Sequence, residues 1–159
     1  MKAEEPDMKL FLDTNILFDF ISGREPHFSS AQRLVVMKAF GDVELCVSGK
    51  SYTDIFYILK KYQGAQEIQD SFLDSLDIFT ICSLEEDDLR AACKLGWPDF
   101  EDALIEISAQ KMGADYLITR DLGFKDSRVT TESPEQIVKV MEGQGLSYAA
   151  IDLDSLNLD

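Results

Sequence analysis

The 159-residue sequence lacks the features that would direct a chain to a membrane or out of the cell. No apolar run approaches the roughly 20 residues that a membrane-spanning helix needs. Residues 1–7 are charged and lack the apolar stretch of a signal peptide. The 3 cysteines form no Cys-x-x-Cys pair. We therefore expect a cytoplasmic protein with reduced, buried thiols and no membrane association.

Positive charge is scarce, because 15 Lys+Arg stand against 30 Asp+Glu and the formal net charge is -15. Lysine and arginine drive nonspecific binding to a phosphate backbone, so this balance disfavours a tight nonspecific nucleic-acid binder. The single histidine, His27, and the scattered cysteines disfavour a zinc site. The carboxylates either form only a solubilising surface or include a few that make a site.

Hydrophobic periodicity predicts strands that alternate with helices along one domain over residues 1–142. We expect an α/β three-layer sandwich with a central, mostly parallel sheet. The polar and acidic residues 143–159 are expected to form either a docked arm or a tail. The predicted strands are 9–12, 43–47, 78–82 and 116–119, and the predicted helices are 16–21, 28–40, 48–62, 65–76, 83–95, 99–112 and 133–141.

Four aspartates fall where a parallel sheet binds its ligands, beyond the carboxyl ends of the strands. Asp13 ends the first predicted strand and Asp121 follows the fourth, while Asp54 and Asp102 lie near helix N-termini. Carboxylates that gather from distant parts of a chain repel one another and raise each other's pKa. A hard divalent cation such as Mg²⁺ or Mn²⁺ relieves that repulsion.

Each of the four also has an ordinary structural explanation. Asp13 can cap the next helix, Asp54 can pair with Lys50 one turn earlier, and Asp121 can be a turn residue. The stretch 99–102 reads Asp-x-x-Asp, a variant of a capping box, and for its first acid we favour the cap. Only the apolar surroundings of Asp13 favour a functional role on local grounds.

Four segments resemble the motifs of a PIN domain, in the same order and at similar spacing over roughly residues 9 to 140. The opening motif is FLDTNILFDFISGREP at residues 11–26, and the second is SYTDIFYIL at 51–59. The third is DFEDAL at 99–104, and the fourth is YLITRD at 116–121. The first and third motifs together carry most of the resemblance.

This resemblance implies a metal-dependent endoribonuclease, often the toxin of a VapBC-type toxin–antitoxin pair. It implies one or two Mg²⁺ or Mn²⁺ ions, an RNA substrate, an antitoxin partner and a homodimer. The second motif usually presents glutamate, and the aspartate here is one methylene shorter. Carried over position by position, the catalytic and metal-binding residues are Asp13, Asp54, Asp102 and Asp121.

Other residues beside the motifs are expected to assist. Polar contacts to ligands or substrate are assigned to Asn15, Thr119 and Asp99, and positive charge at the rim to Arg24, Lys50 and Arg120. An alternative is a PIN-like module that binds a partner and has weak or lost nuclease activity. A phospho-acceptor receiver domain is disfavoured, because no acidic pair follows the first strand and no lysine follows the fourth.

Overall fold

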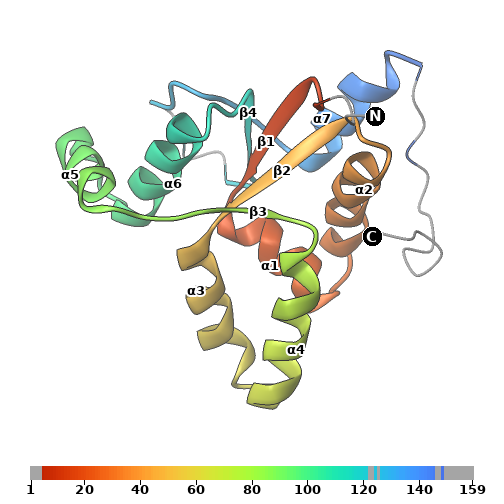
Figure 1. Cartoon of the computed structure of the whole chain (residues 1–159), viewed down its shortest axis with the longest axis horizontal. Helices are drawn as coiled ribbons and strands as arrows, with labels where there is room; N and C mark the ends of the chain where they lie inside the picture. The colour runs from red at the N-terminus through yellow and green to blue at the C-terminus, as the bar shows by residue number, and fades with distance from the viewer. Residues whose placement is uncertain (1–4, 122–123, 125, 146–147, 149–159) are drawn as a thin grey trace.

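A computed structural model describes residues 5–121, 124, 126–145 and 148. Its centre is a five-stranded sheet with the order β3-β2-β1-β4-β5, in which every pair of neighbours is parallel (Figure 1). All five carboxyl ends therefore lie along one edge, which confirms the predicted α/β class. The strands are β1 (Met8–Leu12), β2 (Val43–Ser48), β3 (Thr80–Cys82), β4 (Tyr116–Ile118) and β5 (Thr130–Glu132).

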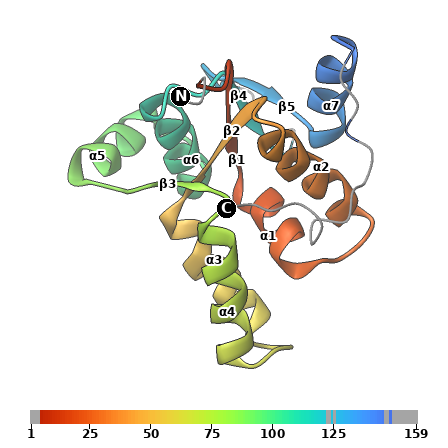
Figure 2. The same cartoon turned by 45° about the vertical axis from the view of Figure 1, so that its right-hand side comes forward.

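Helices cover both faces of this sheet (Figure 2). Leu10 and Leu12 of β1 belong to the larger apolar core, which α1, α2 and α7 complete on one face. Phe11 points to the other face and packs with Ile105 and Ala109 of α6. The helices are α1 (Thr14–Ser22), α2 (His27–Ala39), α3 (Gly49–Leu59), α4 (Ala65–Leu76), α5 (Glu86–Leu95), α6 (Phe100–Lys111) and α7 (Pro134–Glu142).

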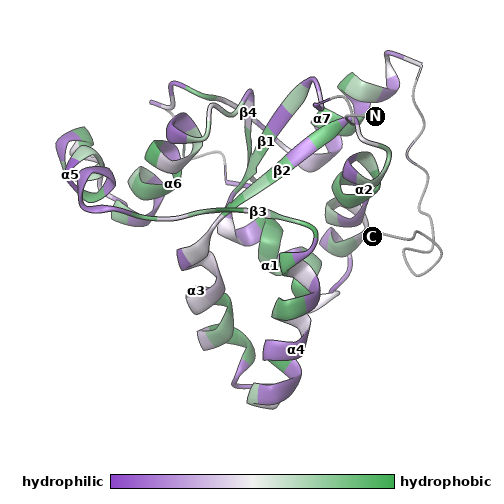
Figure 3. Ribbon diagram, in the orientation of Figure 1, coloured by the Kyte–Doolittle hydropathy of each residue, from purple (hydrophilic) through white to green (hydrophobic). Residues whose placement is uncertain are grey.

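The alternation of side chains along β1 explains why a single strand serves two cores. Figure 3 shows the hydrophobic residues concentrated on the central strands and on the helices packed against them. Helices α3 and α4 form a hairpin that extends away from the body beyond the carboxyl edge (Figures 1 and 2). No helix in the described part of the chain is long and apolar enough to cross a bilayer.

Several elements differ from the sequence prediction. Helix α5 begins at Glu86 rather than 83, strand β3 begins at Thr80 rather than 78, and helix α1 begins at Thr14 rather than 16. Strand β5 was not predicted, because its residues Thr130–Glu132 are polar and its extended form depends on pairing with β4. Helix α3 ends at Leu59, three residues early, because Leu59 is the last residue of its buried stripe. Ser48 caps this helix as predicted, accepting a hydrogen bond from the backbone N of Lys50 at 3.2 Å.

One residue of the predicted C-terminal arm is held firmly. Tyr148 is buried, and its hydroxyl donates a hydrogen bond to Asp42 Oδ2 at 2.7 Å. Its ring lies against Phe40, with the two centroids 6.1 Å apart. Residues 143–145 follow α7 directly and are also described, whereas residues 146–147 and 149–159 of the arm lie outside the described residues.

Candidate active site

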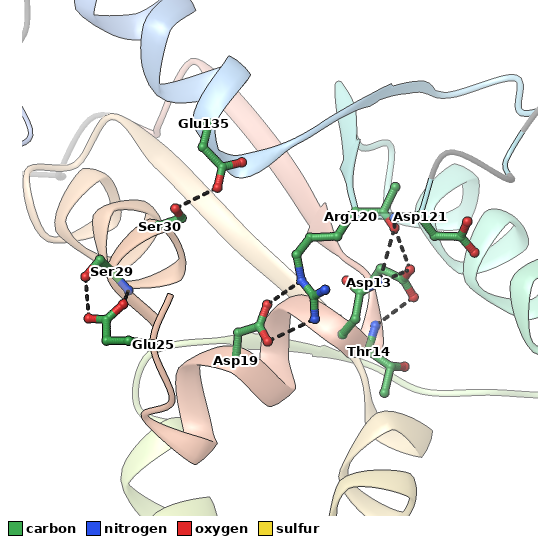
Figure 4. Close-up of polar contacts among 11 residues, drawn as sticks. Asp13, Thr14, Asp19, Glu25, Ser29, Ser30, Arg120, Asp121 and Glu135 are labelled. Carbon is green, nitrogen blue, oxygen red and sulfur yellow. Dashed lines mark hydrogen bonds and ion pairs between the residues drawn. The ribbon is translucent and has the colours of Figure 1, made fainter. Parts of the chain in front are cut away.

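Asp13 stands at the centre of the candidate site, where β1 passes into α1. Its backbone N donates to the carbonyl of Ile118 at 2.9 Å, which extends the pairing of β1 with β4. Its side chain is buried and accepts three hydrogen bonds (Figure 4). Oδ1 accepts from the backbone N of Thr14 at 2.7 Å, and Oδ2 accepts from Thr119 Oγ1 at 2.7 Å and Asn15 Nδ2 at 3.3 Å. Asp13 is thus both a helix cap and an oriented, buried carboxylate.

Thr119 links Asp13 to Asp121. Its buried hydroxyl donates to Asp13 Oδ2 and accepts from the backbone N of Asp121 at 2.9 Å. The two carboxylates follow neighbouring strands, β1 and β4, and Figure 4 shows them beside each other. The sequence prediction that these strand ends meet is consistent with this arrangement.

Asp102 joins the same group from the first turn of α6. Asp99 caps this helix, and its Oδ1 accepts from the backbone N of Asp102 at 3.1 Å. Burial raises the pKa of Asp102 to about 6, with further increases from the charges of Asp99, Asp13 and Asp121. Burial also raises the pKa of Asp13, helped by the charges of Glu101 and Asp121 and opposed by its hydrogen bonds. Each acid therefore costs its neighbours free energy when all are ionised.

Asp54 has a different environment, on α3. Lys50 Nζ lies 2.6 Å from Asp54 Oδ2, so the ion pair expected from their spacing is present. Asp54 is not among the groups whose charges most raise the pKa of Asp13 or Asp102. The start of α3 does reach the start of α1, where Thr14 Oγ1 and Ser51 Oγ lie 2.7 Å apart. Asp54 comes one helical turn after that contact.

The other two cations predicted at the rim also have partners within the chain. The guanidinium of Arg24 lies over the ring of Tyr62, 5.2 Å from its centroid. Arg120 binds Asp19 of α1 through two hydrogen bonds, at 2.7 and 3.1 Å (Figure 4). Sequence reasoning missed Asp19. The available signal was a charged residue inside the apolar stretch 16–21, three positions from Ile16 and hence on the same helix face.

The donor set fits a hard divalent cation such as Mg²⁺ or Mn²⁺. Asp13, Asp102 and Asp121 offer only oxygen, and their mutual repulsion would be relieved by positive charge. Beside them, Asn15 Oδ1 is buried and has no hydrogen-bond partner among the described residues. Within the described part of the chain, no three His, Cys, Asp or Glu side chains already stand close enough to form a ligand shell.

A cavity of about 320 Å³ adjoins the acidic group at the ends of β4 and β5. It is large enough for part of a nucleotide, since small-molecule sites begin near this size, at roughly 300 Å³. Its walls are mainly polar side chains that can donate or accept hydrogen bonds. The lining residues are Thr119, Asp121, Thr131, Glu132, Ser133 and Gln136.

The fold and the site together define a parallel α/β domain with an acidic, oxygen-only group beyond its carboxyl edge. The chain belongs to the PIN domain family, whose sequence model matches residues 9–123. The chain is similar to endonuclease NucS of Corynebacterium urealyticum, with 23% identity over 150 residues. That alignment covers 91% of this chain and 60% of the curated relative, so the chain spans less than two thirds of that protein's length.

Solved structures share the fold. VapBC2 from Rickettsia felis, bound to a DNA fragment from its promoter, aligns with a TM-score of 0.61 and 18% identity over 79% of this chain and 98% of that one. A toxin–antitoxin complex from Klebsiella pneumoniae aligns with a TM-score of 0.59 and 24% identity, covering 79% of this chain and 97% of that one. The sarcin–ricin-loop-cleaving toxin VapC20 of Mycobacterium tuberculosis aligns with a TM-score of 0.61 and 15% identity, covering 76% of this chain and 96% of that one.

Proposed function

We propose that this PIN domain is a metal-dependent endoribonuclease that hydrolyses RNA phosphodiester bonds with Mg²⁺ or Mn²⁺. One observation carries the proposal: buried Asp13 is oriented by three hydrogen bonds and lies within electrostatic reach of Asp121 and Asp102. In the described part of the chain, no lysine or arginine forms an ion pair with Asp13 or Asp102. The RNA-cleaving activity named for VapC20 and the endonuclease activity named for NucS support this choice.

In this proposal Asp13 is the central ligand, and Asp102 and Asp121 complete the set. Asp54 acts through a water molecule, either on the ion or on the attacking water. A divalent cation held there would lower the pKa of a water molecule and neutralise charge on the phosphoryl oxygens. Thr119 keeps Asp13 and Asp121 at a fixed separation by bonding to both. Attack by water on phosphorus, with the 3′-oxygen leaving, yields a 3′-hydroxyl and a 5′-phosphate.

We also propose that the protein is the toxin of a toxin–antitoxin pair and forms a homodimer. The similar structures from Rickettsia felis and Klebsiella pneumoniae are toxin–antitoxin assemblies. A net charge of -15 suits a basic antitoxin, and it slows the approach of RNA. Large apolar side chains are exposed on the α3–α4 hairpin, where a protein partner would cover them; these are Tyr57, Ile58, Leu73 and Leu76, with Tyr62 in the connection.

The decisive experiment compares the wild-type chain with Asp13→Asn on single-stranded RNA in Mn²⁺. Asparagine caps a helix as well as aspartate, so the variant should fold. We expect cleavage by the wild type to stop when Mn²⁺ is chelated. The rate of cleavage should be lower by about 10³-fold in the variant, because a metal ion supplies several kcal/mol of transition-state stabilisation and each 1.4 kcal/mol changes the rate about tenfold. Circular dichroism checks that the metal-free variant is folded, because its amide has one acceptor oxygen in place of the two that accept hydrogen bonds in Asp13. Equal cleavage by both proteins would contradict the proposal.

A second candidate function is a partner-binding module without nuclease activity. The Lys50–Asp54 ion pair favours it, because that pair occupies a carboxylate which the nuclease would use. The variant Asp54→Glu separates the two functions. If the wild type fails to cleave RNA in Mn²⁺ and Asp54→Glu cleaves it, the binding module is correct. If the wild type cleaves and Asp54→Glu changes the rate by less than tenfold, the nuclease is correct.

A further inference from the structure

The ion pair of Asp19 with Arg120 is held by two hydrogen bonds beside the acidic group. Arg120 Nε donates to Asp19 Oδ2 at 2.7 Å, and Nη2 donates to Oδ1 at 3.1 Å. The Asp19 side chain is 7% exposed and the Arg120 side chain is 33% exposed. A guanidinium that donates two parallel hydrogen bonds fixes both distance and orientation, which a lysine in its place does not.

This ion pair spans 101 positions of sequence and joins the two elements that carry the central acids. Asp19 lies on α1, the helix that Asp13 caps, and Arg120 stands between Thr119 and Asp121. Among the described residues, the last backbone hydrogen bond from this segment to β5 is made by Thr119, whose N donates to the carbonyl of Glu132 at 3.0 Å. Arg120 is the next residue, and its side chain attaches the segment to α1.

The same contact keeps a positive charge away from the acids. Arg120 is adjacent in sequence to Asp121, yet its charge is not among the main influences that lower the pKa of Asp13 or Asp102. Its carboxylate partner is Asp19 instead. Arg120 therefore does little to relieve the repulsion that raises the pKa of Asp13 and Asp102.

We propose that Asp19 and Arg120 are positioning residues that set the place of Asp121 relative to Asp13 and thereby the affinity of the site for a divalent cation. This rests on the proposed function. Mg²⁺ accepts oxygen ligands only near 2.0–2.1 Å and in octahedral geometry, so a small displacement of one carboxylate weakens binding strongly. Releasing Arg120 from Asp19 has two consequences in the same direction: Asp121 moves, and the freed guanidinium competes for the acids.

The test measures binding of Mn²⁺ alone to the full chain by electron paramagnetic resonance, without substrate. We expect Asp19→Asn and Arg120→Gln each to raise the dissociation constant by about 10-fold, the lower end of the effect of removing a residue that bonds a metal ligand directly, because this ion pair acts through the backbone beside Asp121. The double variant should bind Mn²⁺ no more weakly than the more affected single variant, because both changes remove the same ion pair. Arg120→Lys keeps the positive charge and loses the two parallel donors, so its dissociation constant for Mn²⁺ should lie between those of the wild type and Arg120→Gln.

A matched control comes from the ion pair of Asp88 with Lys111, which joins α5 to α6. Lys111 Nζ lies 2.8 Å from Asp88 Oδ2, and neither residue is among the charges that shift the pKa of Asp13 or Asp102. Asp88→Asn should leave Mn²⁺ affinity within twofold of wild type although it removes a comparable ion pair. Wild-type affinity in both Asp19→Asn and Arg120→Gln would overturn the proposal. If those two variants fail to fold by circular dichroism, folded Arg120→Lys with wild-type affinity would overturn it.

The wild type and Asp13→Asn separate this inference from the function on which it rests. If the wild type binds Mn²⁺ and Asp13→Asn does not, the proposed site stands, and the Asp19 and Arg120 variants decide only the positioning role. If the wild type and Asp13→Asn show the same lack of Mn²⁺ binding, the proposed function fails and the positioning role fails with it.

Discussion

Helices α5 and α6 begin with similar acidic turns and have opposite electrostatics. In α5 the Asp88 carboxylate accepts from the backbone N of Glu85 at 2.9 Å and from Lys111 Nζ at 2.8 Å, and the hydrogen bond from Lys111 is the main cause of its lowered pKa. In α6 the corresponding acid, Asp102, has its pKa raised to about 6 by burial and by the carboxylates around it. Lys111 neutralises Asp88, whereas no lysine or arginine in the described part of the chain forms an ion pair with Asp102.

The difference in pKa lies mainly outside the two turns themselves. An acid at the cap and another three positions later suit a helix N-terminus, because the terminal N–H groups and the helix dipole favour negative charge. The pKa of the second acid then depends on its surroundings. The hydrogen bond from Lys111 lowers the pKa of Asp88, whereas burial raises the pKa of Asp102, with further increases from Asp99 in the turn and from Asp13 and Asp121 at the strand ends. The Asp88 carboxylate therefore stabilises the fold, whereas the ionised Asp102 carboxylate costs stability, and in the proposed function that cost is relieved by a cation.

The largest expected effect comes from neutralising the corresponding acid in each turn. Asp102→Asn should lower kcat/KM for RNA cleavage in Mn²⁺ by about 10³-fold, because loss of a metal ligand removes several kcal/mol of charge stabilisation. Asp88→Asn should change it by less than threefold and should lower the free energy of unfolding, since Lys111 loses its partner. Steady-state kinetics on both purified variants measure the contrast. Equal losses in the two variants would remove the functional distinction between the turns.

The same contrast shows how far sequence could predict the site. The positions of Asp13 and Asp121 followed from the sheet alone, because the carboxyl ends of parallel strands share one edge. Ion pairs between distant segments did not follow, because they depend on how those segments pack. Arg120 pairs with Asp19 across 101 residues, so its place beside Asp121 in sequence was a poor guide to its contact.

Secondary structure was predictable where hydrophobic periodicity or a capping residue marked the element. Helix α4 has the predicted bounds Ala65–Leu76, and Ser133 caps α7 by accepting from the backbone N of Gln136 at 3.1 Å. Strand β5 was missed because its three polar residues carry no hydrophobic pattern, and only the neighbouring β4 makes them a strand. The Lys50–Asp54 ion pair was expected because it is local to one helix turn.

A second prediction concerns the stability of the metal-free protein between pH 4 and 6. The folded-state pKa of Asp102 is about 6 and its ordinary value is 3.8, so the folded state binds more protons in this window. Stability from this group is present below the ordinary value and is lost as the pH rises through the folded value. For Asp88, whose pKa is lowered, stability is present above the ordinary value and is lost as the pH falls.

Thermal unfolding of metal-free protein across this range, followed by circular dichroism, measures the effect. We expect Asp102→Asn to reduce the fall in unfolding temperature between pH 4 and 6 by a few degrees, and Asp88→Asn to leave that fall unchanged or steeper. Saturating Mn²⁺ should flatten the wild-type curve toward that of Asp102→Asn, because the ion stabilises the charged carboxylate. A fall of the same size in wild type and Asp102→Asn would show that other groups govern this range.

The smallest expected effect separates the two roles of Asp99, which caps α6 and adds negative charge beside Asp102. Asp99→Asn keeps the cap and removes the charge, so the free energy of unfolding at pH 7 should stay within about 0.5 kcal/mol of wild type, while the pKa of Asp102 falls. Asp99→Ala removes both the cap and the charge and should lower the free energy of unfolding by about 1 kcal/mol. Ser133→Ala, which removes the cap of α7, should lower it by a similar amount. Urea unfolding measures the first quantity and carboxyl chemical shifts the second. An unchanged pKa of Asp102 in Asp99→Asn would mean that burial and the strand-end acids alone raise it, which would place the electrostatic contrast with α5 in the fold rather than in the turn.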